Sequence, residues 1–201
     1  MEIREQIVDV ATRLFAANGF DSTPLQEIAD SVGIRKASLL YHFRSKDELR
    51  RNVLTKMLSH WNEALPRLLK AAASGEDQFE AIVSEMVRFF TADPDRARLL
   101  VREVLDRPDE TKKMIGEHVR PWVDIVCNYI RKGKEQGLLH GDVDPEAYVV
   151  QVINLVVASV ATYNCIGSLL TPDETDKDVF ARHVRELMRV AHSSLFVARE
   201  N

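Results

Sequence analysis

The sequence predicts an all-α protein of about nine helices. Apolar residues recur at spacings of three and four along most of the chain, and no alternating strand pattern bounded by turns is present. Capping residues, prolines and glycines divide the chain into segments of helical length. With 201 residues, 45% of them hydrophobic and 29% charged, the composition is that of a globular protein.

Four helix starts are predicted within the first fifty residues. An apolar stripe begins at Ile3, and Gly19 followed by Phe20 predicts that the first helix ends near Asn18. Thr23 supplies a capping hydroxyl ahead of a proline at the first helical position, so a second helix runs to about residue 31. Gly33 permits a tight turn into a short third helix over residues 35–43. The Ser45–Glu48 capping box opens a fourth helix that we expect to reach Ala72.

The rest of the chain predicts five longer helices. Asp-Pro and Pro-Asp pairs mark three starts, and Gly137 marks a stop after two lysines. A bend is expected at Pro121 inside the third of these helices. The predicted spans are residues 78–91, 94–106, 109–136, 145–169 and 174–198.

Residues 147–172 carry no charged side chain, which makes them a candidate for a membrane-spanning helix. The stretch is interrupted by polar residues such as Gln151 and Asn154, and acids rather than lysine or arginine flank it. A helix buried on all sides by other helices requires the same apolarity. We therefore expect a core helix and no membrane span.

The second and third predicted helices form a helix-turn-helix arrangement, in which one helix can lie in the major groove of DNA. Helical periodicity gives them a buried side, and it directs a small, polar and aromatic set outward, which suits contact with base edges. The expected buried residues are Leu25, Ile28, Ala29, Val32, Ile34, Leu39 and Phe43, and the outward set is Arg35, Ala37, Ser38 and Tyr41.

Charge is distributed unevenly around this motif. The whole chain carries 27 Lys+Arg and 31 Asp+Glu, a net charge of −4. Residues 1–34 hold two basic and six acidic side chains, net −4, whereas residues 35–51 hold six basic side chains against Asp47 and Glu48, net +4. The positive field is thus confined to the stretch that would meet phosphates. A solvated, charged turn without a ligand is the alternative interpretation.

Residues 7–49 read IVDVATRLFAANGFDSTPLQEIADSVGIRKASLLYHFRSKDEL and resemble the N-terminal domain of the TetR family of transcriptional regulators. The resemblance implies a TetR-like fold, with a helix-turn-helix DNA-binding domain over residues 1–50 and a helical ligand-binding and dimerisation domain over residues 51–201. The matching pieces are Leu14-Phe15, Gly19-Phe20, Thr23, Ile28-Ala29, Gly33-Ile34, His42-Phe43 and Ser45-Lys46.

The resemblance also implies which residues contact DNA. Thr23, Tyr41, His42 and Lys46 would hold phosphates, and Arg35, Lys36, Ala37 and Ser38 would face bases or flanking phosphates. A lysine at a helix N-terminus opposes the helix dipole, which favours an external anion as its partner. A histidine beside a buried phenylalanine can equally be structural. The chain departs from the family pattern at Arg35, where a small capping serine is common, and at Leu40, where an aromatic residue is common.

The family resemblance further implies that the last two helices pair with those of a second subunit. The last predicted helix carries an apolar stripe, and the helix before it is apolar all round. Together they offer more apolar surface than one core requires, which favours a homodimer on a palindromic site. An intramolecular helix pair is the alternative. The residues expected at the dimer interface are Val184, Leu187, Ala191 and Leu195.

Candidate effector-binding residues are polar or aromatic groups embedded in apolar helices. Arg102, Glu103 and Asn154 need partners if they are buried, and His118 and Trp122 share one helix face. Structural pairing of the Arg and Glu, and a plain core stripe for the helix face, remain open alternatives.

These observations predict a sequence-specific DNA-binding regulator, a ligand-responsive homodimeric repressor in the cytoplasm. The chain lacks a phosphate-binding glycine loop, a metal-ligand cluster and a nucleophile elbow, so no enzyme, cofactor or metal is expected. Cys127 and Cys165 are isolated, and no secretory signal opens the sequence. The alternative is a helical ligand-sensing or interaction protein that does not read DNA.

Overall fold

The computed structural model describes residues 2–71, 75–170 and 176–197, and it confirms the all-α prediction. Within this part of the chain, one short antiparallel bridge between Leu139 and Phe196 is the sole β-type pairing. The helices are α1 (Ile3–Asn18), α2 (Leu25–Val32), α3 (Lys36–His42), α4 (Lys46–Ala71), α5 (Gly75–Thr91), α6 (Pro94–Asp106), α7 (Pro108–His118), α8 (Arg120–Glu135), α9 (Pro145–Ile166), the 3-10 helix η1 (Gly167–Leu169) and α10 (Asp176–Ser193).

The helix predicted over residues 109–136 is two helices, so the described residues contain one α-helix more than expected. One helix ends at His118 and the next begins at Arg120, so the helix is interrupted instead of bent at Pro121. Pro121 lies in the first turn of α8, where its missing N–H costs nothing. Inside a continuous helix, the same ring would clash with the carbonyl group four residues earlier, which explains the break.

The last predicted helix, residues 174–198, ends earlier in the structure. α10 spans Asp176–Ser193, while Glu174 and Ala198 lie outside the described residues. After α10 the chain turns back toward the segment that follows α8, and the amide of His140 donates to the carbonyl of Leu195 at 3.0 Å.

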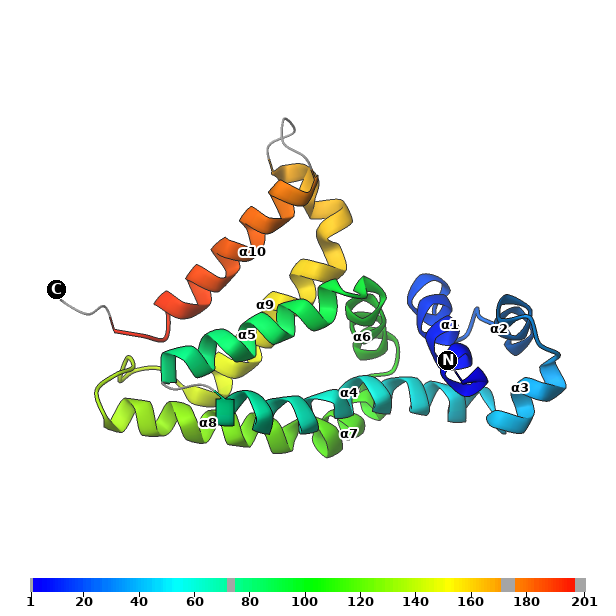
Figure 1. The fold of residues 1–201 in the computed structure, drawn as a ribbon, viewed down its shortest axis with the longest axis horizontal. Helices are drawn as coiled ribbons and strands as arrows, with labels where there is room; N and C mark the ends of the chain where they lie inside the picture. Colours follow the sequence, from blue (N-terminus) through cyan, green and yellow to red (C-terminus); the bar gives the residue numbers. More distant parts are fainter. Residues whose placement is uncertain (1, 72–74, 171–175, 198–201) are drawn as a thin grey trace.

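The helices form a small head and a larger body joined by one long helix (Figure 1). α1 packs against α2 and the first part of α4, α2 packs against α3, and α4 then continues into the body along α7 and α8. α6 lies against α1 on one side and α9 on the other. Buried apolar residues form one continuous core from Ile7 in α1 to Leu195 beyond α10.

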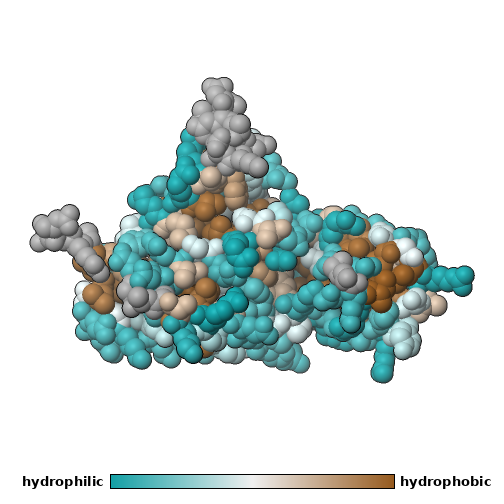
Figure 2. Space-filling model, in the orientation of Figure 1, coloured by the Kyte–Doolittle hydropathy of each residue, from teal (hydrophilic) through white to brown (hydrophobic). Residues whose placement is uncertain are grey.

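α9 corrects the expectation of a helix buried on every side. Together with η1 it is long and apolar enough to cross a membrane by length and composition, with a mean hydropathy of 1.7. Val149, Val152 and Val156 face the core, but Val150 and Leu155 are exposed. Figure 2 shows apolar surface between the upper parts of α9 and α10. α9 therefore has one buried apolar face and one uncovered side, on which apolar residues such as Val150 and Leu155 flank the polar Gln151 and Asn154.

Candidate functional site

The helix-turn-helix is built around Gly33, which ends α2 in the left-handed conformation with φ +80°. The following amide, that of Ile34, donates to the carbonyl of Ala29 at 3.0 Å, which closes the turn. Ile28 in α2 and Leu39 in α3 are fully buried, so the two helices share the apolar side that periodicity predicts. This packing fixes which face of α3 is left outside.

The outer face of α3 presents the polar and aromatic side chains predicted for base contact. Lys36, Ala37 and Ser38 are exposed, and Tyr41 is 85% exposed. His42 is half-buried, and its ring meets that of Tyr41 edge-on at 5.4 Å. Arg35 precedes the helix as its N-cap, without a side-chain cap bond, and is also exposed. The described structure thus leaves this face of α3 uncovered.

Thr23 occupies a different position from the one predicted. α2 begins at Leu25, with Pro24 as its N-cap, so the hydroxyl of Thr23 does not cap it. That hydroxyl is fully buried and donates to the carbonyl of Gly19 at 2.8 Å, which ties the end of α1 to the start of α2. Its phosphate contact stays a prediction, one that the burial of the hydroxyl disfavours.

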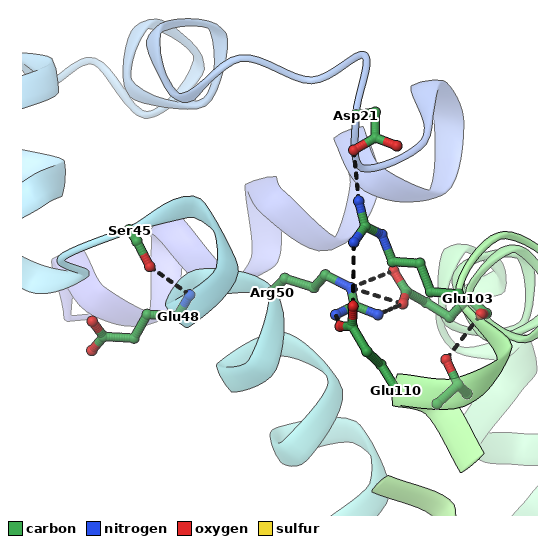
Figure 3. A network of polar contacts seen from close by, with 8 residues as sticks. Asp21, Ser45, Glu48, Arg50, Glu103 and Glu110 are labelled. Carbon is green, nitrogen blue, oxygen red and sulfur yellow. Dashed lines mark hydrogen bonds and ion pairs between the residues drawn. The ribbon is translucent and has the colours of Figure 1, made fainter. Parts of the chain in front are cut away.

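The start of α4 forms the serine half of the predicted capping box, while the Glu48 carboxylate accepts from the amide of Arg44 instead of that of Ser45. The Oγ of Ser45 accepts from the amide of Glu48 at 3.0 Å (Figure 3). Lys46 lies in the first turn, where its Nζ donates to the carbonyl of Asp21 at 3.2 Å and sits 4.4 Å from the centre of the Phe20 ring. Partial burial lowers the pKa of Lys46, and the nearby charge of Asp21 opposes that effect. The Lys46 ammonium group is therefore held against the head by Asp21 and Phe20, and a DNA phosphate would add a further contact.

A buried ion pair joins the head to the body. Arg50, on α4, is 1% exposed, and its Nε donates to the Glu103 carboxylate of α6 at 2.8 Å. Its Nη2 donates to the same carboxylate, and its Nη1 reaches Glu110 on α7 at 2.5 Å (Figure 3). The hydroxyl of Thr111 donates to the carbonyl of Glu103 at 2.9 Å. We call Arg50, Glu103 and Glu110 the clasp. Because its guanidinium is buried in these contacts, Arg50 is unavailable to DNA. It nevertheless belongs to the basic stretch that was expected to meet phosphates.

Two further arginines reinforce this boundary. Arg102 donates from Nη2 to the carbonyl of Ala17, at the end of α1, at 3.0 Å. Arg107 donates to the carboxylate of Asp21 at 2.6 Å. The predicted effector residues Arg102 and Glu103 thus lie between the head and the body, which corresponds to the structural pairing left open by the sequence.

The body contains a cavity of about 980 Å³ between α5, α8, α9 and the segment after α10. Among the five predicted effector residues, Trp122 lines this cavity, while Arg102, Glu103, His118 and Asn154 do not. Asn154 is exposed and His118 half-buried at the end of α7. Polar residues within an apolar helix did not identify the cavity wall, because the inner faces of several helices form that wall.

Sequence reasoning missed most of the cavity wall. α5 contributes Phe79 and Met86, α9 contributes Tyr148, and the end of the chain contributes His192 and Phe196. The hydroxyl of Tyr148 donates to the carbonyl of Ala191 at 2.6 Å, and burial raises the pKa of Tyr148. The aromatic residues stand at helical spacing, but nothing in a single sequence separates a cavity wall from a filled core.

The predicted dimer residues are largely covered within the single chain, and their place at an interface stays a prediction. Leu187, Ala191 and Leu195 are buried within their own chain, and Val184 is half-buried. The strongest apolar stripe of a helix turns toward the core of its own subunit, since that burial is available to a single chain. Several exposed apolar residues lie on α9, on η1 and on the other face of α10, and others lie elsewhere, for example on α6 and α8. Those on α9, η1 and α10 are Val150, Leu155, Ile166, Leu169 and Val190.

Two family models cover most of the chain. The model described as "Bacterial regulatory proteins, tetR family" matches residues 7–53, and "Tetracyclin repressor-like, C-terminal domain" matches residues 76–190, over half of the sequence. The chain belongs to the TetR family. This TetR-family protein is a DNA-binding transcriptional regulator, and α1–α3 form its helix-turn-helix unit.

Similar proteins of known function are regulators as well. This chain is 26% identical to the HTH-type transcriptional repressor KstR2 of Mycolicibacterium smegmatis. The match covers 83% of this chain and 82% of KstR2. The fold of this chain matches FadR of Bacillus subtilis in complex with stearoyl-CoA (TM-score 0.74, 16% identity, 94% and 98% of the two chains covered). It also matches AibR in complex with isovaleryl coenzyme A and operator DNA (TM-score 0.71, 21% identity, 93% and 98% covered).

Proposed function

We propose that this TetR-family regulator is a cytoplasmic, homodimeric repressor that releases a palindromic operator when an acyl-coenzyme A thioester enters the cavity of its body. It performs no catalysis in this role. The observation that carries the proposal is the pairing of an uncovered α3 face in the head with a large apolar cavity in the body. One long helix, α4, connects the two.

The DNA-reading part of the proposal rests on side chains that are free to meet a duplex. Arg35, Lys36, Ala37 and Ser38 face outward at the start of α3, where a recognition helix reads base edges. Tyr41 and the adjacent α4 start, with Lys46, suit phosphates. In the proposed complex, phosphate contacts set affinity and the α3 face sets sequence preference.

The effector class rests on the shape and chemistry of the cavity. Its wall is largely aliphatic and aromatic, including Ile82, Val126 and Val152, which suits an apolar ligand. The more exposed part of the lining carries Lys132 and the His192–Glu76 pair, whose Nε2 and Oε1 are 2.8 Å apart. An acyl group inside with a charged carrier outside fits this layout, and FadR and AibR, which share the fold, are described in complex with such thioesters.

The homodimer rests on the uncovered apolar surface of α9, η1 and α10. Val150, Leu155 and Ile166 are each at least one-third exposed and follow one another along α9, and Val190 is exposed on α10. A second copy of the chain would cover this surface by two-fold symmetry. Symmetry would also present two α3 helices to half-sites about one DNA turn apart.

The test is selection of genomic DNA fragments by the purified full-length protein at near-physiological salt, followed by sequencing. We expect one enriched, roughly palindromic site. Stearoyl-CoA and isovaleryl-CoA are then titrated into the protein–operator complex, with free coenzyme A as the control for the carrier. Release of DNA by a thioester, but not by coenzyme A, supports the proposal.

Two outcomes contradict different parts of this proposal. Failure to enrich any sequence at low as well as high salt would favour a ligand-sensing protein that does not read DNA. An enriched operator that neither thioester releases would retain the regulator and reject the effector class. Because coupling between two ligands is reciprocal, operator DNA must also weaken thioester binding by the same factor.

A further inference from the structure

Asp21, between α1 and α2, contacts one cation of the head and one cation of the body. Its carboxylate accepts from Nη2 of Arg107 at 2.6 Å (Figure 3), and its backbone carbonyl accepts from Nζ of Lys46 at 3.2 Å. Arg107 joins α6 to α7 in the body, whereas Lys46 opens α4 a few residues after α3. The predicted phosphate contact and a body arginine therefore meet at one residue.

The same two cations share one aromatic ring. Nζ of Lys46 and the guanidinium carbon of Arg107 each lie 4.4 Å from the centre of the Phe20 ring. Like charges this close repel each other, which favours a carboxylate that neutralises one of them. Burial lowers the pKa of Lys46, the charge of Asp21 opposes that effect and the charge of Arg107 adds to it. The Lys46 ammonium group therefore responds to both Asp21 and Arg107.

The Asp21 carboxylate is able to change partners. Its side chain is 85% exposed, whereas that of Arg107 is 22% exposed. An ion pair with an exposed member is weak, so loss of one cation lets the carboxylate turn to another. Lys46, which already donates to the backbone of Asp21, is within reach. A Lys46 that is paired with this carboxylate must break the pair before it binds a phosphate.

We infer that Arg107 is a positioning residue for DNA binding: it occupies the Asp21 carboxylate from the body and so leaves the Lys46 ammonium group to a DNA phosphate. Without Arg107, the carboxylate pairs with Lys46 and competes with the phosphate. The body thereby acts on the affinity of the head for DNA. This inference rests on the phosphate contact of Lys46 in the proposed function and adds the residue that controls it.

The test is titration of a labelled operator, found by the selection described above, with full-length variants over a salt series. We expect Arg107→Gln to weaken binding by a factor close to that of Lys46→Ala, and to lower the salt slope of log K by up to about one. The double variant Asp21→Asn/Arg107→Gln should recover affinity and slope, because no carboxylate is left to pair with Lys46. Asp21→Asn alone should bind at least as tightly as wild type.

Arg102→Gln is the matched control. Arg102 crosses the same boundary, but it donates to the backbone carbonyl of Ala17 and not to a carboxylate. The variant removes the same charge without releasing an anion, so we expect the salt slope of wild type. Arg107→Lys keeps a cation for Asp21 and should bind close to wild type. Melting temperatures measured on the same samples show that each variant is folded during the titrations.

The outcomes separate this inference from the function on which it rests. Equal losses of affinity and slope in Arg107→Gln and Arg102→Gln would reduce the effect to the loss of one positive charge, and would overturn the role of Arg107. A double variant as weak as Arg107→Gln would remove Asp21 as the competitor. A slope that falls in Lys46→Ala but not in Arg107→Gln rejects the inference alone. An unchanged slope in Lys46→Ala rejects the phosphate contact itself, and the inference with it.

Discussion

Arg50 on α4 and Glu103 on α6 form a buried, charge-assisted hydrogen-bonded pair across the boundary between the head and the body. The side chains are 1% and 4% exposed. Water can therefore not replace either partner if the other is lost. This pair joins the DNA-reading head to the body together with the Arg102–Ala17 and Arg107–Asp21 contacts.

Removal of one partner of the pair should destabilise the protein strongly. We expect Arg50→Met to lower the free energy of unfolding by about 3–5 kcal/mol, because it leaves the Glu103 carboxylate buried without its cation. Urea denaturation measures the change. The double variant Arg50→Met/Glu103→Leu should recover part of the loss, and a double variant whose cost equals the sum of both single variants would show that the pair does not couple.

Lys46 and Ser38 should affect DNA binding in different ways. Lys46→Ala removes a phosphate contact, so we expect all sites to weaken about equally and the salt slope of log K to fall by about one. Ser38→Ala should instead change which bases are preferred at one position of the half-site. Titrations of a labelled operator and its single-base variants over a salt series measure both effects. An unchanged salt slope in Lys46→Ala would remove Lys46 from the interface.

Gly133 should control the width of the ligand cavity. A Cβ at this position would lie 2.7 Å from Cδ1 of Leu139, so Gly133→Ala requires that leucine to shift, and both residues line the cavity. We expect weaker binding of stearoyl-CoA, measured by calorimetry. Gly116→Ala, where a Cβ meets nothing within 4 Å, is the matched control. Equal affinity of both variants would mean that Leu139 moves away from the ligand.

A charge on the uncovered face of α9 should prevent dimer formation. Leu155 is exposed in the single chain and would be buried by a second copy, so Leu155→Lys should give a mass near one chain by light scattering at concentrations where wild type is a dimer. Lys112→Glu on the exposed side of α7 is the charge control. A Leu155→Lys protein that remains fully dimeric would place the interface elsewhere.

Acid should remove a stabilising contribution from Glu85. Hydrogen bonds from Arg88 lower the pKa of this carboxyl below its ordinary value of 4.5, with a further contribution from His60. A depressed pKa in the folded protein stabilises it above the unfolded pKa, and the effect is lost as pH falls through the folded value. The stability difference between wild type and Glu85→Gln should therefore shrink below about pH 4.5. A constant difference from neutral to acidic pH contradicts this linkage.

The head could be derived from the sequence because its signals are local. The Gly33 turn, the Ser45–Glu48 capping box and the outward face of α3 each depend on residues a few positions apart. The body could not be derived in the same way. Nothing near Glu103 in the sequence indicates Arg50 as its partner, and the apolar stripe through Leu187 has the same spacing whether it faces its own core or a second subunit.

The short bridge between Leu139 and Phe196 means that the ligand cavity is closed by two segments more than fifty positions apart in the sequence. One of them follows α10 directly, so a reporter or affinity tag fused beyond Val197 would pull on that wall. Ligand titrations on a tagged protein would then measure the tag as well as the cavity. A cleavable tag, removed before any effector is added, allows binding to the cavity to be measured without the effect of the tag.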